Sequence, residues 1–124
     1  MPKEYGTPGP RALHPDVATS KSLGRCGILA QLLFDRLISQ ADDQGRLEDG
    51  AEYVKAICLP LVSKATAKAV EEALDELARE GMLQRYKADG RDLIQLTSWW
   101  AYQGAMRWSS PSRWPAPDGW EDRI

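Results

Sequence analysis

The chain has 124 residues, a formal net charge of −2 and a single histidine. This length suits one compact domain and is short for two, because domains of about 100–150 residues are the commonest. The net charge excludes a protein that coats nucleic acid by charge alone, since affinity for phosphates requires clustered Lys and Arg. Only the first 25 residues carry more Lys and Arg than acids.

The first residues contain no apolar signal-peptide core, and no apolar run reaches the roughly 20 residues that a membrane helix needs. We therefore expect no membrane partner. Cys26 and Cys58 lie far apart among apolar neighbours, as buried reduced thiols do. The expected location is a reducing cytoplasm.

Residues 1–15 include four prolines, which cannot donate backbone hydrogen bonds to a helix or sheet, so they predict a flexible or extended arm. A short helix capped by Asp16 is expected over residues 16–23. Apolar residues then recur at helical spacing over residues 28–41, with Gly27 as the N-cap. Residues 42–45 break this helix, and residues 46–48 suit a short strand.

A second helix is expected over residues 50–59, capped by Asp49 and stopped by Pro60. A third is expected over residues 66–80. It ends at Gly81, the residue type that best adopts the left-handed conformation after a helix. After Gly81 the apolar spacing changes to that of strands, and Asp89-Gly90 is a strong hairpin signal. A tight turn there would place Lys87 opposite Asp92 and Leu83 opposite Leu96.

Helix, short strand, helix, helix and hairpin follow one another in the order of a winged helix-turn-helix. The predicted fold class is mainly α with a small β-hairpin: a domain over residues 16–102, between the arm and a Pro/Trp/Arg-rich tail over residues 103–124. Of residues 99–124, Trp99, Trp100 and Tyr102 are expected to close the core under the wing, while the rest lies along the surface. The predicted core residues are Leu33, Phe34, Leu37, Ile57, Leu74, Leu77, Leu83 and Leu96.

Enzymatic chemistry is disfavoured, because His14 lies in the arm and a histidine-based triad or metal site lacks parts. Cys26, Cys58 and His14 show no Cys-x-x-Cys spacing. Asp42 and Asp43 resemble a turn that ends a helix more than a metal pair. The sequence therefore predicts no catalytic residue, no metal and no cofactor.

Most of the chain resembles the N-terminal domain of phage replication proteins, the replisome-organiser or DnaD-like group. The resemblance rests on residues 13–15, 22–25, 30–34, 41–47 (Ala-Asp-Asp-Gln-Gly-Arg-Leu), 54–56, 77–83 (Leu-Ala-Arg-Glu-Gly-Met-Leu), Tyr86 with 89–90, and 111–113 before Pro115. It implies a winged helix that recognises origin DNA or assembles an initiation complex in the bacterial host cytoplasm. In longer members a linker and a second domain follow, and the tail resembles the beginning of such a linker.

Double-stranded DNA is the first partner that this reading suggests. In a helix-turn-helix the start of the third helix enters the major groove, while the wing holds phosphates. The candidate DNA-binding residues are Ser63, Lys64, Thr66 and Lys68 at the helix start, with Arg85, Lys87 and Arg91 on the wing. We expect the five cations to line one positive edge.

The outer face of the third helix argues for a different partner. It carries Glu71, Glu72, Asp75, Glu76 and Glu80, which would repel a duplex lying along it; Lys68 and Glu72 suit an ordinary solvated pair. An adaptor that binds a host or phage replication protein, or inhibits host machinery, is therefore the alternative. Arg107, Trp108, Arg113 and Trp114 are the candidate partner-binding residues, since Trp and Arg anchor interfaces and also stack on unpaired bases. A homodimer remains open.

Overall fold

The computed structural model of the chain describes residues 8–104 and 109–124. Within these ranges it contains a short 3-10 helix, five α-helices and three strands. Their order and bounds are η1 Pro15–Thr19, α1 Lys21–Gly24, α2 Ile28–Gln40, β1 Arg46–Glu48, α3 Ala51–Cys58, α4 Ala67–Arg79, β2 Leu83–Ala88, β3 Arg91–Leu96 and α5 Trp99–Gln103.

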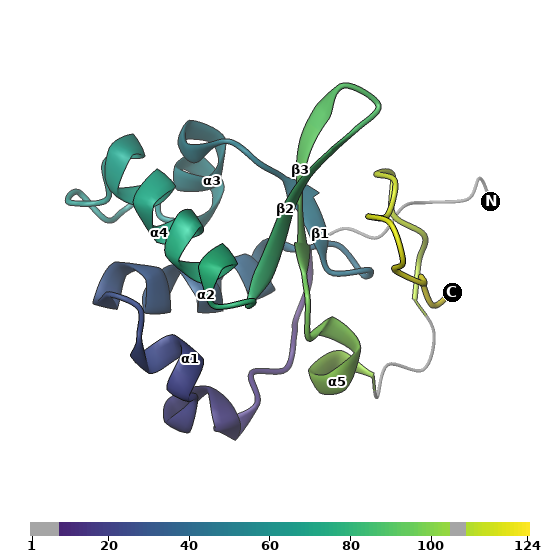
Figure 1. Cartoon of the computed structure of the whole chain (residues 1–124), viewed down its shortest axis with the longest axis horizontal. Coiled ribbons are helices and arrows are strands. Elements are labelled where there is room, and N and C mark those ends of the chain that lie inside the picture. The colour runs from purple at the N-terminus through teal and green to yellow at the C-terminus, as the bar shows by residue number, and fades with distance from the viewer. Residues whose placement is uncertain (1–7, 105–108) are drawn as a thin grey trace.

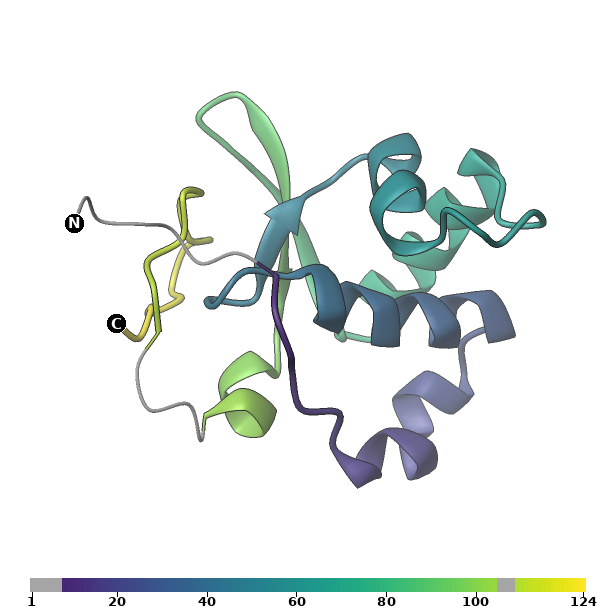
Figure 2. The same cartoon turned by 180° about the vertical axis from the view of Figure 1, so that it is seen from behind.

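Helices α1 to α4 pack on one side of the sheet, and residues 109–124 lie on its other side (Figure 1). The strand order is β1-β3-β2, with every neighbouring pair antiparallel. The β2–β3 hairpin projects beyond the helices, as the reverse view also shows (Figure 2). The molecule is thus mainly helical with a small antiparallel sheet, which agrees with the predicted class.

Helix α4 forms where the sequence predicts and ends at Gly81 as expected, with Thr66 as its N-cap. The Thr66 side chain accepts a hydrogen bond from the Ala69 N–H at 3.1 Å. At the other end, the N–H groups of Gly81 and Met82 donate to the carbonyls of Ala78 and Leu77, which closes the last turn. Gly81 has φ +73°, as predicted. The helix therefore begins and ends on local chemistry.

The hairpin also has the predicted register. Leu83 pairs with Leu96 and Lys87 with Asp92. Asp89 and Gly90 both have positive φ, at +52° and +73°, as a tight two-residue turn requires. The short strand over Arg46–Glu48 is confirmed as well, and it pairs with β3.

Two predicted N-caps are wrong. The expected helix over residues 16–23 is split, because Ser20 adopts an extended conformation and its hydroxyl caps a new helix by accepting from the Leu23 N–H. His14 caps the 3-10 helix, a role predicted for Asp16. The N-cap of α3 is Gly50, not the predicted Asp49. The φ of Gly50 is +130°, which other residues rarely adopt.

The main core lies between α2, α3, α4 and the helix-facing side of the sheet. Of the predicted core residues, Phe34 and Ile57 are partly buried against it and the other six are buried. Trp99 is also buried in this core, and Trp100 packs against it. Tyr102 was expected to help close the core but is exposed, while Gln103 is buried.

The other face of the sheet is buried too. Side chains alternate along strands, so Arg46, Gln95 and Leu93 share the face that points away from the main core. All three are buried, yet Leu93 does not belong to the main core cluster. Residues 109–124, here called the C-terminal segment, cover this face (Figure 1).

Candidate functional site

The start of α4 is exposed and positively charged. Ser63, Lys64, Thr66 and Lys68 are all solvent-exposed, as a DNA-contacting surface requires. Within residues 8–104 and 109–124, neither Lys64 nor Lys68 has an acidic side chain within ion-pair distance. The predicted pair between Lys68 and Glu72 is therefore not formed, and both lysines remain available to an anion.

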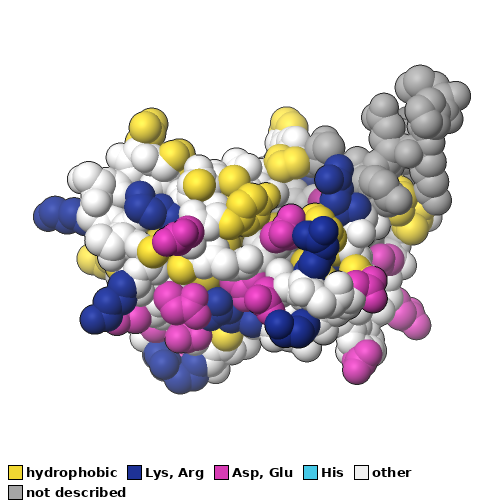
Figure 3. Space-filling view, turned by 90° about the horizontal axis from the view of Figure 1, so that it is seen from above, with side chains coloured by type: hydrophobic (Ala, Val, Ile, Leu, Met, Phe, Trp, Pro, Cys, Tyr) yellow, Lys and Arg dark blue, Asp and Glu magenta, His cyan; other side chains and the backbone are white. Residues whose placement is uncertain are grey.

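Leu61 belongs to the same surface and was missed by sequence reasoning. It lies in the turn between α3 and α4, and 96% of its surface is exposed. Leu61 directly follows Pro60, which stops α3, and this position in a turn could have indicated its exposure. We call Leu61, Ser63, Lys64, Thr66 and Lys68 the α4-start surface. Lys and Arg side chains project at the end of the molecule where the α3–α4 turn lies (Figures 1 and 3).

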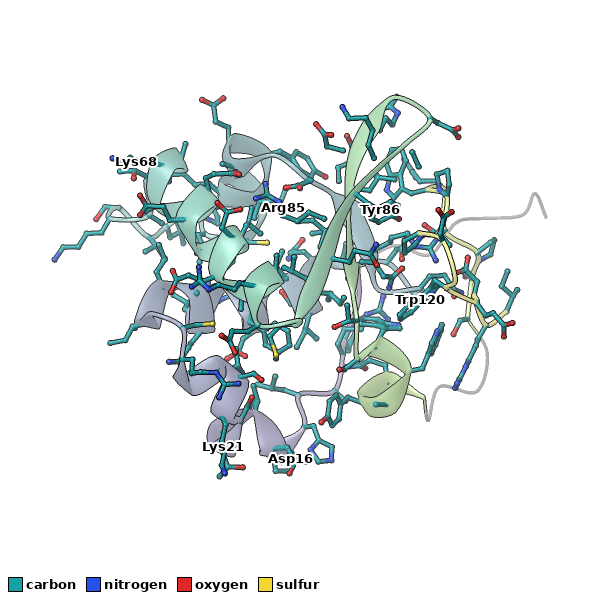
Figure 4. All side chains as sticks on the ribbon, in the orientation of Figure 1. Asp16, Lys21, Lys68, Arg85, Tyr86 and Trp120 are labelled. Carbon is teal, nitrogen blue, oxygen red and sulfur yellow. The ribbon has the colours of Figure 1, made fainter. Side chains whose placement is uncertain are left out.

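Arg85 does not line a positive edge with the lysines, contrary to expectation. Its guanidinium lies between the hairpin and α4 (Figure 4) and donates to Asp49 at 2.7 and 3.0 Å, to Glu71 at 2.7 and 3.0 Å and to Asp75 at 2.9 Å. These hydrogen bonds from Arg85 lower the pKa of Glu71. Three carboxylates outweigh one guanidinium, so this part of the surface is acidic.

An open hollow of about 480 Å³ lies over this ion-pair cluster. Its lining residues are Asp49, Gly50, Glu71, Arg85, Tyr86 and Asp92. The hollow separates the α4-start surface from the hairpin tip, so the predicted positive edge is interrupted by acids. Figure 3 shows this alternation of acidic and basic side chains across the face seen from above.

The remaining two hairpin cations are also partnered. Lys87 Nζ lies 3.2 Å from a carboxylate oxygen of Asp92, with both side chains exposed. Arg91 lies 3.6 Å from Glu48 and stacks over the Trp114 ring at 5.2 Å from its centre. Exposed pairs of this kind are weak, so Lys87 can still exchange its partner for a phosphate.

Two acidic residues on the outer face of α4 make contacts that stabilise the fold. The Glu76 carboxylate accepts a hydrogen bond from the Gly27 N–H at 2.8 Å, which caps the first turn of α2. Glu80 pairs with Arg25 at 2.7 Å. Glu72 is exposed and has no such contact within the described residues. Of the predicted acidic residues, Glu72 is thus the one that tests the charge of this face without disturbing the fold.

The 42–46 loop shapes a turn, as predicted for its two aspartates. Asp42 accepts hydrogen bonds from the N–H groups of Gln44 and Arg46 at 2.9 and 3.1 Å. Burial raises the pKa of Asp42. Asp43 accepts from Arg11 and from the Ser110 N–H, both at 2.9 Å. This loop therefore ties the arm and the C-terminal segment to the domain.

Gln44 and Arg46 hold the C-terminal segment from beneath. The Gln44 amide donates to the carbonyls of Ser110 and Arg123 at 2.9 and 2.7 Å, and accepts from the Arg123 N–H at 2.9 Å. Arg46 donates to the Trp114 carbonyl at 2.6 Å, and it also donates to the Asp122 carboxylate. Sequence reasoning missed these contacts, although polar residues inside a short strand were a signal.

The predicted partner-binding residues are only partly described. Arg107 and Trp108 lie outside the described residues. Arg113 contacts the Trp114 ring at 5.9 Å from its centre, so these two neighbours do stack. However, Trp114 is half-buried and already carries Arg91 over its ring. Trp114 therefore already has contacts within the chain, while Arg113 is exposed.

Cys26 and Cys58 are free and buried, as predicted. Burial raises the pKa of the Cys58 thiol to about 12, which leaves it unreactive. His14 contacts the Tyr102 ring, with ring centres 4.7 Å apart. In the part of the chain that the structure describes, no group of three or more His, Cys, Asp or Glu residues could hold a metal ion. Across the same residues, no helix is long and apolar enough to span a membrane.

Comparison with protein-family models, with curated proteins and with solved structures found no match to this chain. The functional assignment therefore depends on the geometry of the surfaces described above and on the sequence resemblance.

Proposed function

We propose that the chain is a winged helix-turn-helix module that binds double-stranded DNA through the α4-start surface, as part of phage-type replication initiation or its regulation in the host cytoplasm. The order α2, β1, α3, α4 and hairpin supports the winged-helix assignment. Under this proposal α3 and α4 form the helix-turn-helix, and the hairpin is the wing. The module itself performs no catalysis.

One observation carries the DNA-binding proposal: two exposed lysines at the start of α4 have no ion-pair partner among the described residues. Lys64 and Lys68 flank the helix N-terminus, where the helix dipole also favours an anion. Ser63 adds a hydroxyl that can donate to phosphate, and Leu61 adds an apolar side chain suited to a thymine methyl group. The acidic face begins one turn further along, so the helix docks by its end.

The test is a gel-shift titration with duplex DNA at several salt concentrations. A Lys64→Gln, Lys68→Gln double variant should lower the log-log salt slope by about two units, because each lost phosphate contact removes nearly one. Lys21→Gln is the control, since Lys21 is an exposed lysine on α1, well away from Lys68 (Figure 4). Equal effects of both changes, or no salt-sensitive binding by the wild type, would refute the proposal.

A second candidate function is an adaptor that binds a basic segment of a replication protein. The acidic outer face of α4 favours it, because Glu72 and the carboxylates around Arg85 repel a duplex and attract cations. A Glu72→Lys variant distinguishes the two functions. It should weaken capture of a protein partner if the chain is an adaptor, and should leave DNA retention intact or stronger if the chain binds DNA end-on.

A further inference from the structure

The C-terminal segment contacts both the 42–46 loop and the outer part of the β2–β3 hairpin. Its first residues attach to the 42–46 loop, where the Ser112 hydroxyl donates to Asp42 at 2.6 Å. Its end attaches to the same loop, where Arg123 exchanges two hydrogen bonds with Gln44. Arg123 also stacks over Trp100 of α5, at 5.2 Å. Both ends of the segment are therefore anchored to the body of the domain.

The middle of the segment contacts the hairpin. The Tyr86 hydroxyl, on β2, donates to the Pro115 carbonyl at 2.6 Å. Arg91, on β3, stacks over the Trp114 ring at 5.2 Å. Figure 4 shows Tyr86 on the side of the hairpin that faces the segment. One contact falls on each hairpin strand, so the segment restrains the hairpin as a unit.

Trp114 is itself fixed in position by the domain. Its carbonyl accepts from the buried Arg46 guanidinium at 2.6 Å, and its N–H donates to the Ser112 hydroxyl at 3.1 Å. The Trp114 ring therefore presents a rigid surface to Arg91. A chain of contacts runs from the 42–46 loop through Trp114 to the hairpin.

Side chains make most of the attachment. Within the described residues, the segment's backbone–backbone hydrogen bond, from Trp120 to Pro117, lies inside the segment itself, and side chains make its polar links to the domain. The Trp120 indole N–H is buried and finds no acceptor among the described residues. An unsatisfied buried donor costs about 1–3 kcal/mol, which offsets part of the binding.

We propose that the C-terminal segment is a strap that immobilises the β2–β3 hairpin through Tyr86 and Arg91, and that its release makes the hairpin mobile while the helical core stays folded. A change in the position of residues 109–124 would therefore change the mobility of the hairpin. This proposal concerns the hairpin's rigidity, and it stands whether or not the α4-start surface binds DNA.

Amide hydrogen exchange in the full chain tests the strap. A Tyr86→Phe, Trp114→Ala double variant removes both contacts to the hairpin and keeps the anchors at Ser112 and Arg123. We expect hairpin amides over residues 85–92 to exchange about tenfold faster or more, while amides of α2 and α4 change by less than about twofold. Asp118→Asn, an exposed change in the same segment, should alter neither.

Two outcomes would overturn the proposal. Unchanged hairpin exchange would mean that the segment merely lies on the sheet. An equal acceleration in the hairpin, α2 and α4 would mean that the segment contributes to overall stability without restraining the hairpin. If the double variant does not fold, Tyr86→Phe alone replaces it. This change removes the hydroxyl through which Tyr86 holds the segment, so hairpin amides should again exchange faster than those of α2 and α4.

Discussion

The Arg46 side chain is completely buried, although it carries a charge. A buried guanidinium is tolerated only where its donors are satisfied, and Arg46 donates to Gln95, to the Trp114 carbonyl and to Asp122. Two of these three partners come from the C-terminal segment. Arg46, which the sequence predicts only as a strand residue, therefore joins the sheet to the C-terminal segment.

Arg46→Met should lose about 3–5 kcal/mol of unfolding free energy, because it leaves the Asp122 carboxylate and the oxygens of Gln95 and Trp114 without their donor. Chemical denaturation measures this loss. Lys21→Met, an exposed change, should stay within about 0.5 kcal/mol of the wild type. A loss below about 1 kcal/mol for Arg46→Met would show that the segment does not depend on this side chain.

The ion pair between Glu71 and Arg85 should make the stability of the fold depend on pH. Its pKa is lowered because Arg85 donates hydrogen bonds to its carboxylate. A carboxyl group with a lowered folded-state pKa contributes stability above its ordinary pKa, about 4.3, and loses that contribution as the pH falls through the folded value. Asp49 and Asp75 form ion pairs with the same guanidinium.

Glu71→Gln should therefore be less stable than the wild type near neutral pH, and the difference should shrink as the pH is lowered to about 3. Urea denaturation across this range measures it. Glu72→Gln is the matched control, since exposed Glu72 contacts no cation among the described residues, and its difference from the wild type should not follow pH. A Glu71→Gln difference that stays constant would contradict the ion-pair role.

At the scale of elements, the helices and turns that the sequence predicted well are those that depend on residues close together in the chain. Helix α4 and the hairpin follow from Thr66, Gly81 and the Asp89-Gly90 turn, all of which act within a few residues. The path of the C-terminal segment depends on contacts such as Gln44 with Arg123, which are 79 residues apart. No local pattern encodes such a pairing, so the second covered face of the sheet was missed.

The same reason explains the outcome for the candidate site. Exposure of Lys64 and Lys68 followed from their position in a turn and a first helical turn. The neutralisation of Arg85 did not, because Asp49 is 36 residues away and Glu71 is 14. Strand alternation placed Arg85 on the helix-facing side of the sheet, beyond Leu83, and this was the available signal.

Gly81 tests the junction between α4 and the hairpin. A Cβ added there would meet no atom within 4 Å, so the cost of a side chain comes from the φ of +73° alone. Gly81→Val should therefore lose about 1–2 kcal/mol of unfolding free energy. Gly24→Ala is the control, because its Cβ also meets nothing and its φ is unremarkable, and it should lose nothing. Equal effects at both glycines would contradict the left-handed junction.

At the scale of the whole molecule, Lys64 and Arg91 differ in their place along the long axis and in their partners. The α3–α4 turn and the C-terminal segment lie at opposite ends of the long axis (Figure 1). Among the described residues, Lys64 at the first end has no ion-pair partner, whereas Arg91 near the second already has Glu48 and the Trp114 ring as partners. A duplex that docks on the end of α4 thus meets Lys64 directly, while Arg91 must first leave its partners.

Single substitutions distinguish this end-on docking from a duplex that spans α4 and the hairpin. Lys64→Gln should weaken DNA binding and lower the log-log salt slope by about one unit, because it removes one phosphate contact. Arg91→Gln removes the same charge but should leave the slope unchanged, because a duplex docked on the end of α4 does not reach Arg91, which stacks over the Trp114 ring. Salt-dependent gel-shift titrations of both variants measure the two slopes. Equal losses would place the hairpin on the duplex as well and would contradict end-on docking.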